Sequence, residues 1–453
     1  MTDFAALLQP DRGQPAQRIE IVDAAGLDGW LTAQTPAVRA AVAGQQFVAK
    51  PGSAAIVATA DGWHVVATLD SGPWALAKLA ETLPEGTYRL DGGDVPLLGW
   101  LLGQYRFDRY RKPERPGPRI LLTPHVAQID HAVRLAGATA LVRDLVNTGA
   151  SDLGPAELEA EAETLATRHG ATVTTTRGEA LARGYPMIHA VGIAASADRA
   201  PRLIELEWGD PEHPRVALVG KGVCFDSGGL DIKPAAGMRL MKKDMGGAAH
   251  ALALASLVMA AKLPVRLHLL IPAVENAISG NAFRPGDVLA TRAGLTVENT
   301  NTDAEGRLVL GDALTRACEE RPALILDFAT LTGAARVALG PDLPPMFSDD
   351  EDLAADLLAA GVAQGDPMWR MPMWNAYDEM LKSDVADLVN APEGGFAGAI
   401  TAALFLRRFV DRDIPWAHLD VFAWRPSAKP GRPKGGDAYA LRAAFAMLST
   451  RFG

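Results

Sequence analysis

The middle of the sequence alternates short apolar segments with apolar helices, and this alternation constrains the fold more than any other feature. Strands are predicted at Val216–Val219, Val265–Ala273 and Leu324–Phe328, and helices at Gly246–Ala261 and Gly306–Cys318. The order strand, helix, strand, helix is typical of a mixed, mainly parallel sheet covered by helices on both faces. We therefore expect an α/β protein whose ligands bind where strands end and helices begin.

The chain of 453 residues is too long for one domain, since a domain typically holds about 100–200 residues. Residues 109–119 are charged and Pro-rich, which is typical of an exposed linker. We expect a small N-terminal α/β domain with this linker over residues 1–120, and a larger domain over 121–453 whose lead-in helix covers about 126–147. In the small domain the pattern predicts strands at Phe47–Ala49, Ala54–Ala58 and His64–Leu69, and helices at Ala75–Leu83 and Leu97–Tyr105.

Acidic residues gather in Gly-rich segments of the larger domain. Asp303 and Glu305 stand two positions apart, and side chains at this spacing in an extended segment point the same way. Asp226 and Asp244 lie upstream in segments that also contain glycine pairs. Carboxylates with no neighbouring His suit hard divalent cations. Three cationic residues lie in the same segments: Lys221, Lys233 and Arg307. The four acids and these three cations together predict a dinuclear metal site.

Each acidic residue also has a simpler interpretation. Asp226 lies in a segment with strong turn chemistry, Asp244 and Asp303 precede apolar helices and could cap them, and Glu305 could be a first-turn acid that complements a helix dipole. The simpler interpretations suit single residues. The joint occurrence of four acids and three cations favours a metal site.

Four motifs of the larger domain resemble those of the leucyl aminopeptidase family, the cytosolic dizinc exopeptidases. The resemblance covers about residues 140–425, whereas the N-terminal domain and the segment after Trp424 depart from the family pattern. It implies a metal-dependent aminopeptidase that removes the first residue from peptides with a free N-terminus and prefers Leu-like residues. The motifs are Asn301-Thr-Asp-Ala-Glu-Gly-Arg-Leu308, Phe225-Asp-Ser-Gly-Gly229, Asp244-Met-Gly-Gly-Ala248 and Thr330-Leu-Thr-Gly-Ala334.

The resemblance also implies two divalent ions per subunit, Zn²⁺ or Mn²⁺ with Co²⁺ or Mg²⁺ as alternatives. A water that bridges the ions would be the nucleophile. By this resemblance, one ion is held by Lys221, Asp226, Asp244 and Glu305, and the other by Asp226, Asp303 and Glu305.

The remaining roles come from the same resemblance. Lys233 would stabilise the oxyanion, and Arg307 would hold a bicarbonate ion that acts as general base. The family's substrate pocket corresponds to Met241, Asn301, Thr330, Leu331 and Gly333.

Composition and missing motifs argue against other classes of protein. The net charge of −10 argues against nucleic acid as the main partner, because phosphate binding needs clustered Lys and Arg. Lys221 lacks the upstream Gly of a phosphate-binding loop, and no Gly-x-Ser-x-Gly stands at a strand-to-helix turn. The sequence shows no basic segment followed by an apolar core at its start and no run of about 20 apolar residues, so we expect a cytoplasmic protein without a membrane partner.

Two alternatives stay open at this stage. One is a narrower dipeptidase, such as one that acts on cysteinylglycine, and the other is a DNA-binding regulatory role that some family members have. The resemblance also implies a homo-hexamer of two stacked trimers. The apolar helices at Gly246–Ala261 and Ala397–Phe409 agree with large subunit interfaces.

Overall fold

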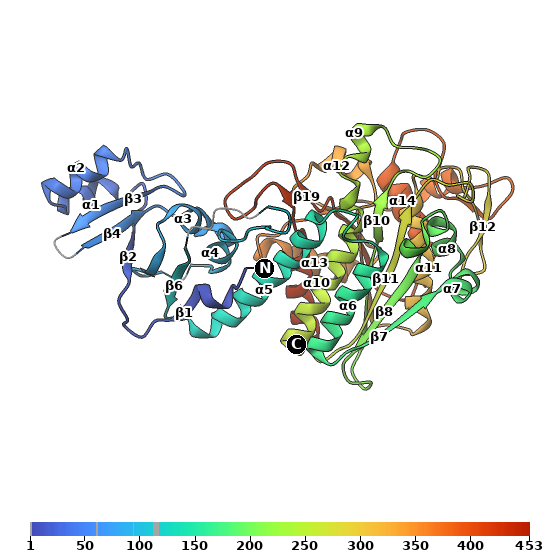
Figure 1. Cartoon of the computed structure of the whole chain (residues 1–453), viewed down its shortest axis with the longest axis horizontal. Helices are drawn as coiled ribbons and strands as arrows, with labels where there is room; N and C mark the ends of the chain where they lie inside the picture. Colours follow the sequence, from blue (N-terminus) through green and yellow to red (C-terminus); the bar gives the residue numbers. More distant parts are fainter. Residues whose placement is uncertain (1, 60–61, 94, 112–116) are drawn as a thin grey trace. The chain divides into compact units, whose positions relative to one another are not determined.

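The computed structural model describes residues 2–59, 62–93, 95–111 and 117–453. The chain forms two compact units, the first made of Met1–Ala140 with Ser427–Lys434 and the second of Leu141–Pro426 with Gly435–Gly453 (Figure 1). The domain boundary predicted at residue 120 stays a prediction. Part of the predicted linker, residues 112–116, lies outside the described residues.

The first unit contains a six-stranded sheet in the order β1-β6-β5-β2-β4-β3. All neighbouring strands are parallel except β3 and β4, which form an antiparallel pair. The predicted strand at Phe47–Ala49 is wrong, because this segment has no strand pairing and Phe47 packs instead into a small cluster with Val42 and Val57. The elements are β1 (Leu8–Pro10), β2 (Gln17–Ile21), α1 (Leu27–Ala33), α2 (Pro36–Gly44), β3 (Ala54–Thr59), β4 (Gly62–Ala67), α3 (Ala77–Thr82), β5 (Gly86–Leu90), α4 (Leu98–Leu102) and β6 (Arg119–Thr123).

Helix α5 (Val126–Asn147) occupies the residues of the predicted lead-in helix. The second unit is built on a mixed sheet in the order β16-β15-β18-β14-β9-β11-β8-β7, with β10 also paired to β11. Its central strands β18, β14, β9, β11 and β10 are parallel. The strands are β7 (Thr172–Arg177), β8 (Arg202–Trp208), β9 (Arg215–Gly220), β10 (Gly222–Asp226), β11 (Arg266–Asn276), β14 (Leu324–Ala329), β15 (Pro345–Phe347), β16 (Trp369–Arg370) and β18 (Trp416–Asp420).

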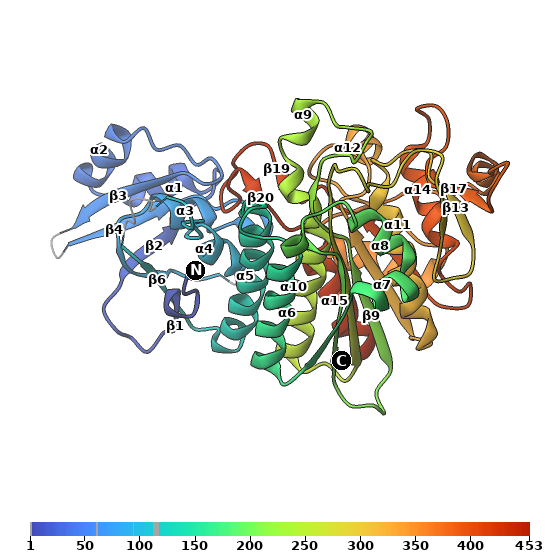
Figure 2. The same ribbon diagram turned by 45° about the vertical axis from the view of Figure 1, so that its right-hand side comes forward.

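Helices cover both faces of this sheet, as the sequence predicted (Figure 2). On one face α10 (Gly246–Ala261) packs against the sheet beside α6 (Pro155–His169) and α15 (Leu441–Phe452), and α13 (Glu351–Ala363) packs on α15. The other face carries α8 (Pro186–Gly192), α11 (Glu305–Glu319) and α14 (Gly398–Arg407), with α7 (Gly178–Gly184) beside α8. The remaining elements border the sheet: α9 (Ala235–Met238), a 3₁₀ turn η4 (Met241–Met245), α12 (Gly333–Leu339), β12 (Val288–Ala290), β13 (Thr296–Glu298), β17 (Leu388–Val389), β19 (Trp424–Arg425) and β20 (Gly435–Gly436).

Helix α10 is the central helix of the second unit. The stretch Met241–Ala261 is long and apolar enough to cross a membrane, although the sequence had suggested no such stretch. However, 83% of its most apolar window is buried inside the protein, so the chain's own sheet and helices cover it. The same burial means that α10 does not supply the subunit interface that its apolar sequence suggested.

Candidate functional site

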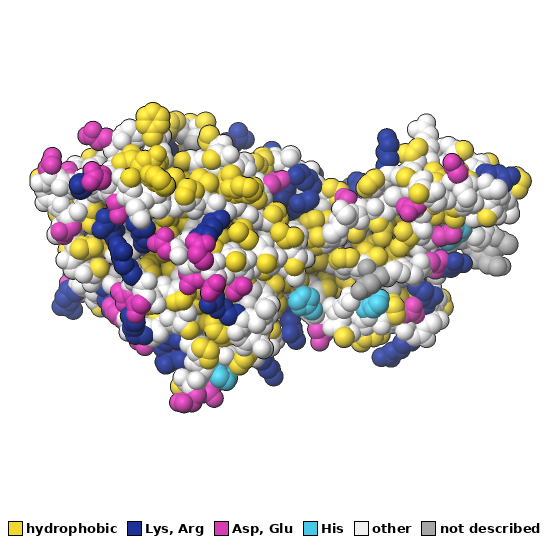
Figure 3. Space-filling model, turned by 180° about the vertical axis from the view of Figure 1, so that it is seen from behind, with side chains coloured by type: hydrophobic (Ala, Val, Ile, Leu, Met, Phe, Trp, Pro, Cys, Tyr) yellow, Lys and Arg dark blue, Asp and Glu magenta, His cyan; other side chains and the backbone are white. Residues whose placement is uncertain are grey.

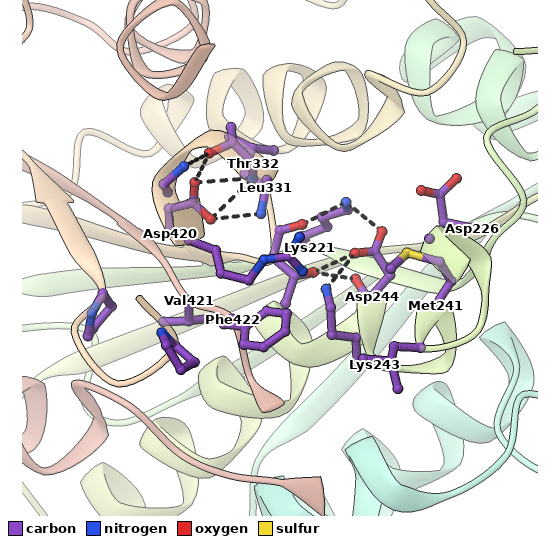
Figure 4. Close-up of a pocket in the computed structure, with 18 of the residues that line it drawn as sticks. Lys221, Asp226, Met241, Lys243, Asp244, Leu331, Thr332, Asp420, Val421 and Phe422 are labelled. Atoms are coloured by element: carbon purple, nitrogen blue, oxygen red, sulfur yellow. Dashed lines mark hydrogen bonds and ion pairs between the residues drawn. The ribbon is translucent and has the colours of Figure 1, made fainter. Parts of the chain in front are cut away.

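The parallel strands of the second unit bring their carboxyl ends to one edge of the sheet, and polar residues stand at nearly every one of these ends. Lys221 follows β9, Asp226 ends β10, Asn276 ends β11, Thr330 follows β14 and Asp420 ends β18. Open α/β sheets bind ligands at this edge. Most of these side chains line one cavity of about 340 Å³ (Figure 4).

Three acidic side chains meet in this cavity. Asp226, Asp244 and Glu305 are buried, and each offers an oxygen that lies within 4.8 Å of the others. Glu305 is the first residue of α11, and Asp303 lies in the turn before it rather than in an extended segment. The sequence argument about their shared direction is therefore wrong in its geometry, and Asp303 lies outside this closest group but lines the same cavity.

Two lysines pair with these acids. The ammonium Nζ of Lys221 lies 2.6 Å from Asp244 Oδ2 and 2.9 Å from Glu305 Oε1. Lys233 Nζ lies 2.7 Å from Asp226 Oδ2 and also pairs with Asp303. Gly306 allows the approach of Lys221, since a Cβ added there would lie 2.7 Å from Lys221 Nζ. Each lysine thus pairs with two of the four acids.

The buried oxygens of this cluster are short of hydrogen bonds. Among the described residues, neither carboxylate oxygen of Glu305 has a hydrogen-bond partner of good geometry, and the same holds for Asp244 Oδ2 and Asp303 Oδ1. Three of these four oxygens have only an ammonium group nearby. Buried acceptors are normally satisfied. Their shortage here fits a pair of divalent ions, which bind to carboxylate oxygens.

The pKa values of these side chains also indicate that the negative charge of the cluster is poorly balanced. Burial, with the charge of Asp226, raises the pKa of Glu305 to about 8 and that of Asp303 to about 6. Burial opposes the charged form of Lys221, but the carboxylates of Asp244, Glu305 and Asp226 outweigh it and raise its pKa. Four acids held together with two lysines therefore carry more negative charge than the site can balance by itself, which favours cation binding.

The simpler roles of these acids are only partly present. Asp226 does stabilise a turn, because its Oδ1 accepts a hydrogen bond from the Gly228 N–H at 2.9 Å. Neither Asp244 nor Asp303 caps a helix, since the N-cap residues of α10 and α11 are Met245 and Ala304. Asp244 instead accepts a hydrogen bond from the Thr330 hydroxyl at 2.9 Å.

Arg307 lies two residues after Glu305, in the first turn of α11, and does not line the cavity among the described residues. Its Nη1 donates to the Asn390 carbonyl at 2.7 Å, whereas its Nε is buried without a hydrogen-bond partner. Burial lowers the pKa of Arg307 to about 10. A buried guanidinium with a spare donor could bind a small anion.

Four of the five predicted substrate residues line the cavity: Met241, Thr330, Leu331 and Gly333. The fifth, Asn301, does not. Its Oδ1 accepts a hydrogen bond from the Asp303 N–H at 2.8 Å, so it shapes the turn that carries Asp303.

Sequence reasoning missed three residues that support the site. Asn276 donates to Asp226 Oδ1 at 2.9 Å and to the Thr302 carbonyl at 3.0 Å. Asp420 accepts hydrogen bonds from the N–H groups of Leu331 and Thr332 and so holds that loop (Figure 4). Asn390 joins the turn before Asp303 to the Arg307 guanidinium. A polar residue at the end of a buried strand was the available signal for Asn276 and Asp420.

The segment after Trp424 contributes little to the lining of the cavity. Ser427–Lys434 belongs to the first unit, where the Gly431 N–H donates to Glu81 at 2.7 Å. Tyr439 is the one residue after Trp424 that lines the cavity among those described.

The chain matches known protein families over most of its length. Residues 140–445 match the catalytic domain of the cytosol aminopeptidase family, and residues 18–123 match the N-terminal domain of the M17 aminopeptidases. The chain belongs to the cytosol aminopeptidase family. The expectation that the N-terminal domain and the segment after Trp424 depart from the family is therefore wrong, because the N-terminal match covers residues 18–123 and the catalytic match runs to residue 445.

Individual relatives support the same family assignment. The crystal structure of cytosol aminopeptidase from Coxiella burnetii has a TM-score of 0.94 and 46% identity, and the match covers 99% of this chain and 100% of that one. The bottromycin maturation enzyme BotP, solved in complex with Mn, has a TM-score of 0.86 and 35% identity, with 97% and 100% covered. A probable cytosol aminopeptidase from Roseiflexus castenholzii is 44% identical over 77% of this chain and 75% of its own length. The chain is thus a metallo-exopeptidase, a metal-dependent aminopeptidase.

Proposed function

We propose that this chain removes the first residue, preferably a Leu-like one, from peptides with a free N-terminus, and that Asp226, Asp244, Asp303 and Glu305 hold the two metal ions. The observation that carries this proposal is the set of buried carboxylate oxygens without hydrogen-bond partners at the carboxyl edge of the sheet. Such oxygens are costly unless a cation binds to them.

The metal ligands divide into shared and single ones in this proposal. Asp226 and Glu305 would hold both ions, Asp244 and Lys221 would hold one, and Asp303 would hold the other. When bound, the ions would acidify a water as nucleophile and would polarise the scissile carbonyl. Lys221 would bind as a neutral amine, since nearby dications lower a lysine pKa strongly. The Mn in the BotP structure agrees with a divalent ion, Mn²⁺ or Zn²⁺.

The remaining residues act on the substrate. Lys233 keeps its charge and stabilises the oxyanion. Arg307 holds a bicarbonate ion as general base through its unpaired Nε. Met241, Thr330 and Gly333 bound the first side chain, Leu331 offers its carbonyl, and Asn301 supports Asp303.

An assay tests this function directly. The purified protein is incubated with leucine amide after addition of Mn²⁺, Zn²⁺ or Co²⁺, and again after a chelator. We expect turnover that requires a divalent ion and that Glu305→Gln abolishes. The control variant Glu319→Gln, at the other end of α11, keeps full turnover, since its ion pair with Arg292 is partly exposed. Turnover without metal, or none with any metal, overturns the proposal.

We also propose that the chain is cytoplasmic and assembles as a hexamer. Several large apolar side chains of the second unit are exposed in the single chain, among them Phe396 at 84%, Val337 at 82% and Trp374 at 60%. Figure 3 shows hydrophobic side chains gathered on one face of this unit. Contiguous exposed apolar patches are typical of protein interfaces. Light scattering on the active protein tests this, and a fully active particle near the 47.9 kDa of one chain contradicts it.

A further inference from the structure

Two further cationic side chains line the cavity beside the carboxylate cluster. Lys243 Nζ lies 5.4 Å from the ring centre of Phe422, and the Arg336 guanidinium lies 4.8 Å from it. Both cations and the ring line the cavity, and Figure 4 shows Lys243 and Phe422 beside Asp244. Lys243 is buried in η4 and Arg336 is exposed on α12. Two positive groups therefore flank one aromatic ring in the cavity wall.

These cations lack dedicated acidic partners. Among the described residues Arg336 has no ion pair, and Lys243 pairs only with Asp244, at 3.5 Å. Asp244 already pairs with Lys221 and accepts a hydrogen bond from Thr330. The other acid nearby, Asp420, is occupied by hydrogen bonds from Leu331 and Thr332. The cavity wall thus carries positive charge that the protein itself leaves poorly balanced.

The count of charged residues around the cavity also indicates excess positive charge once metal ions are bound. Its lining includes five acids and four cationic residues. Two divalent ions would match the charge of the four acids that are proposed to hold them, and this step rests on the proposed function. Lys233, Lys243 and Arg336 would then face a single remaining acid, Asp420. The loaded cavity would attract anions, because charge in a cleft focuses the field.

We propose that Lys243 and Arg336 form a carboxylate-binding subsite beside Phe422 that selects anionic peptides. The carboxylate has two sources: the side chain of an acidic first residue, or the free C-terminus of a dipeptide. Met241 and Gly333, which bound the first side chain in the proposed function, lie two and three residues from Lys243 and Arg336. Guanidinium and ammonium groups bind carboxylates by charge-assisted hydrogen bonds.

Matched substrates separate the two sources. Glutamyl-glycinamide is compared with glutaminyl-glycinamide, which has the same shape without the charge, and leucyl-glycine with leucyl-glycinamide. We expect kcat/KM to favour the carboxylate member of at least one pair by about tenfold or more, because hydrogen bonds to charged groups are stronger than neutral ones. An advantage in the first pair assigns the subsite to the first side chain, and one in the second pair assigns it to the C-terminus.

Variants link the advantage to the residues. Lys243→Met and Arg336→Gln are each expected to reduce it severalfold, mainly through KM, and together to remove it, whereas Arg408→Gln, an exposed arginine outside the cavity, leaves it unchanged. Calorimetric titration of the Mn²⁺-loaded protein with glutamate and glutamine gives a readout without turnover for the first source. Leucine amide turnover with no advantage in either pair overturns the subsite while leaving the proposed function intact. An advantage that survives in the double variant also overturns it.

Discussion

Two of the buried clusters of charged side chains in the second unit differ in how their hydrogen bonds are satisfied. In one, Asp437 lies between Arg143 and Arg425, with each carboxylate oxygen accepting a hydrogen bond of 2.9 Å. In the other, Glu305 has a lysine near one oxygen and no hydrogen-bond partner of good geometry for either.

The pKa values move in opposite directions. Burial opposes the charge of Asp437, but the two arginines outweigh it and lower its pKa. Burial raises the pKa of Glu305 to about 8. A buried acid whose oxygens are all hydrogen-bonded therefore stabilises the fold, whereas a buried acid whose oxygens lack hydrogen bonds indicates a ligand-binding site. This difference separates structural charge from functional charge, and variants in both clusters test it.

The largest effect is expected for Glu305→Gln. Removal of a shared metal ligand reduces metal content below two ions per chain and lowers kcat by about 1,000-fold or more, since metal catalysis contributes several kcal/mol. Elemental analysis and leucine amide kinetics measure both quantities. A variant that keeps two ions and near-normal kcat would mean that the cluster is structural, like that of Asp437.

Lys233→Ala tests a residue of the same cluster that is not a proposed ligand. We expect kcat to fall by roughly 100- to 1,000-fold, as for the loss of an oxyanion donor, with metal content unchanged. The exposed Lys382→Ala serves as control, because its ion pair lies at the surface. Loss of metal in Lys233→Ala would contradict the assigned role.

Asp437→Asn addresses the other cluster. The two buried arginines lose their shared counter-charge, and we expect the free energy of unfolding to fall by roughly 3 kcal/mol. Denaturant unfolding measures this change. Metal content and kcat of the folded variant are expected to stay near wild type, and a selective loss of metal would break the distinction between the clusters.

Asn276→Ala tests the support of a proposed ligand. Its amide holds Asp226 Oδ1, so we expect metal affinity to fall by about tenfold or more. Competition with a metal indicator gives the dissociation constant. The result that would contradict this role is lowered stability with unchanged affinity.

The two clusters also predict opposite dependence on pH in the metal-free protein. The folded state holds the Glu305 proton between its ordinary pKa of 4.5 and about 8, so this residue lowers stability as pH rises through that window. The contribution of Asp437 is present above its unfolded pKa and is lost as pH falls. Unfolding of wild type and Glu305→Gln from pH 5 to 8 is expected to diverge by on the order of 1 kcal/mol per pH unit. Parallel curves would contradict the raised pKa.

The sequence predicted much of the second unit because local pattern determines it. Helix α10 occupies the predicted residues Gly246–Ala261, and strand β14 contains the predicted Leu324–Phe328, since each is a mainly apolar segment between polar or Gly-bearing ends. The segment Phe47–Ala49 was wrong because a short apolar run does not reveal whether a strand partner exists.

The candidate site was predicted less completely. The sequence motifs identified the four acidic residues of the site. They did not identify the residues that support the site, because Asp226 and its partner Asn276 are 50 residues apart and Leu331 and Asp420 are 89 apart. Such pairs depend on which strands are neighbours in the sheet. The geometry of Asp303 was also beyond the sequence, because nothing in the spacing shows that the segment turns before α11.

The most direct test is a crystal structure of the protein grown with Mn²⁺, with anomalous diffraction to locate the metal. The account predicts two peaks among Asp226, Asp244, Asp303 and Glu305, with Lys221 no longer paired to Asp244 and Glu305 as an ammonium ion. A structure with no peak there, and with Lys221 still within hydrogen-bond distance of both acids, would contradict it.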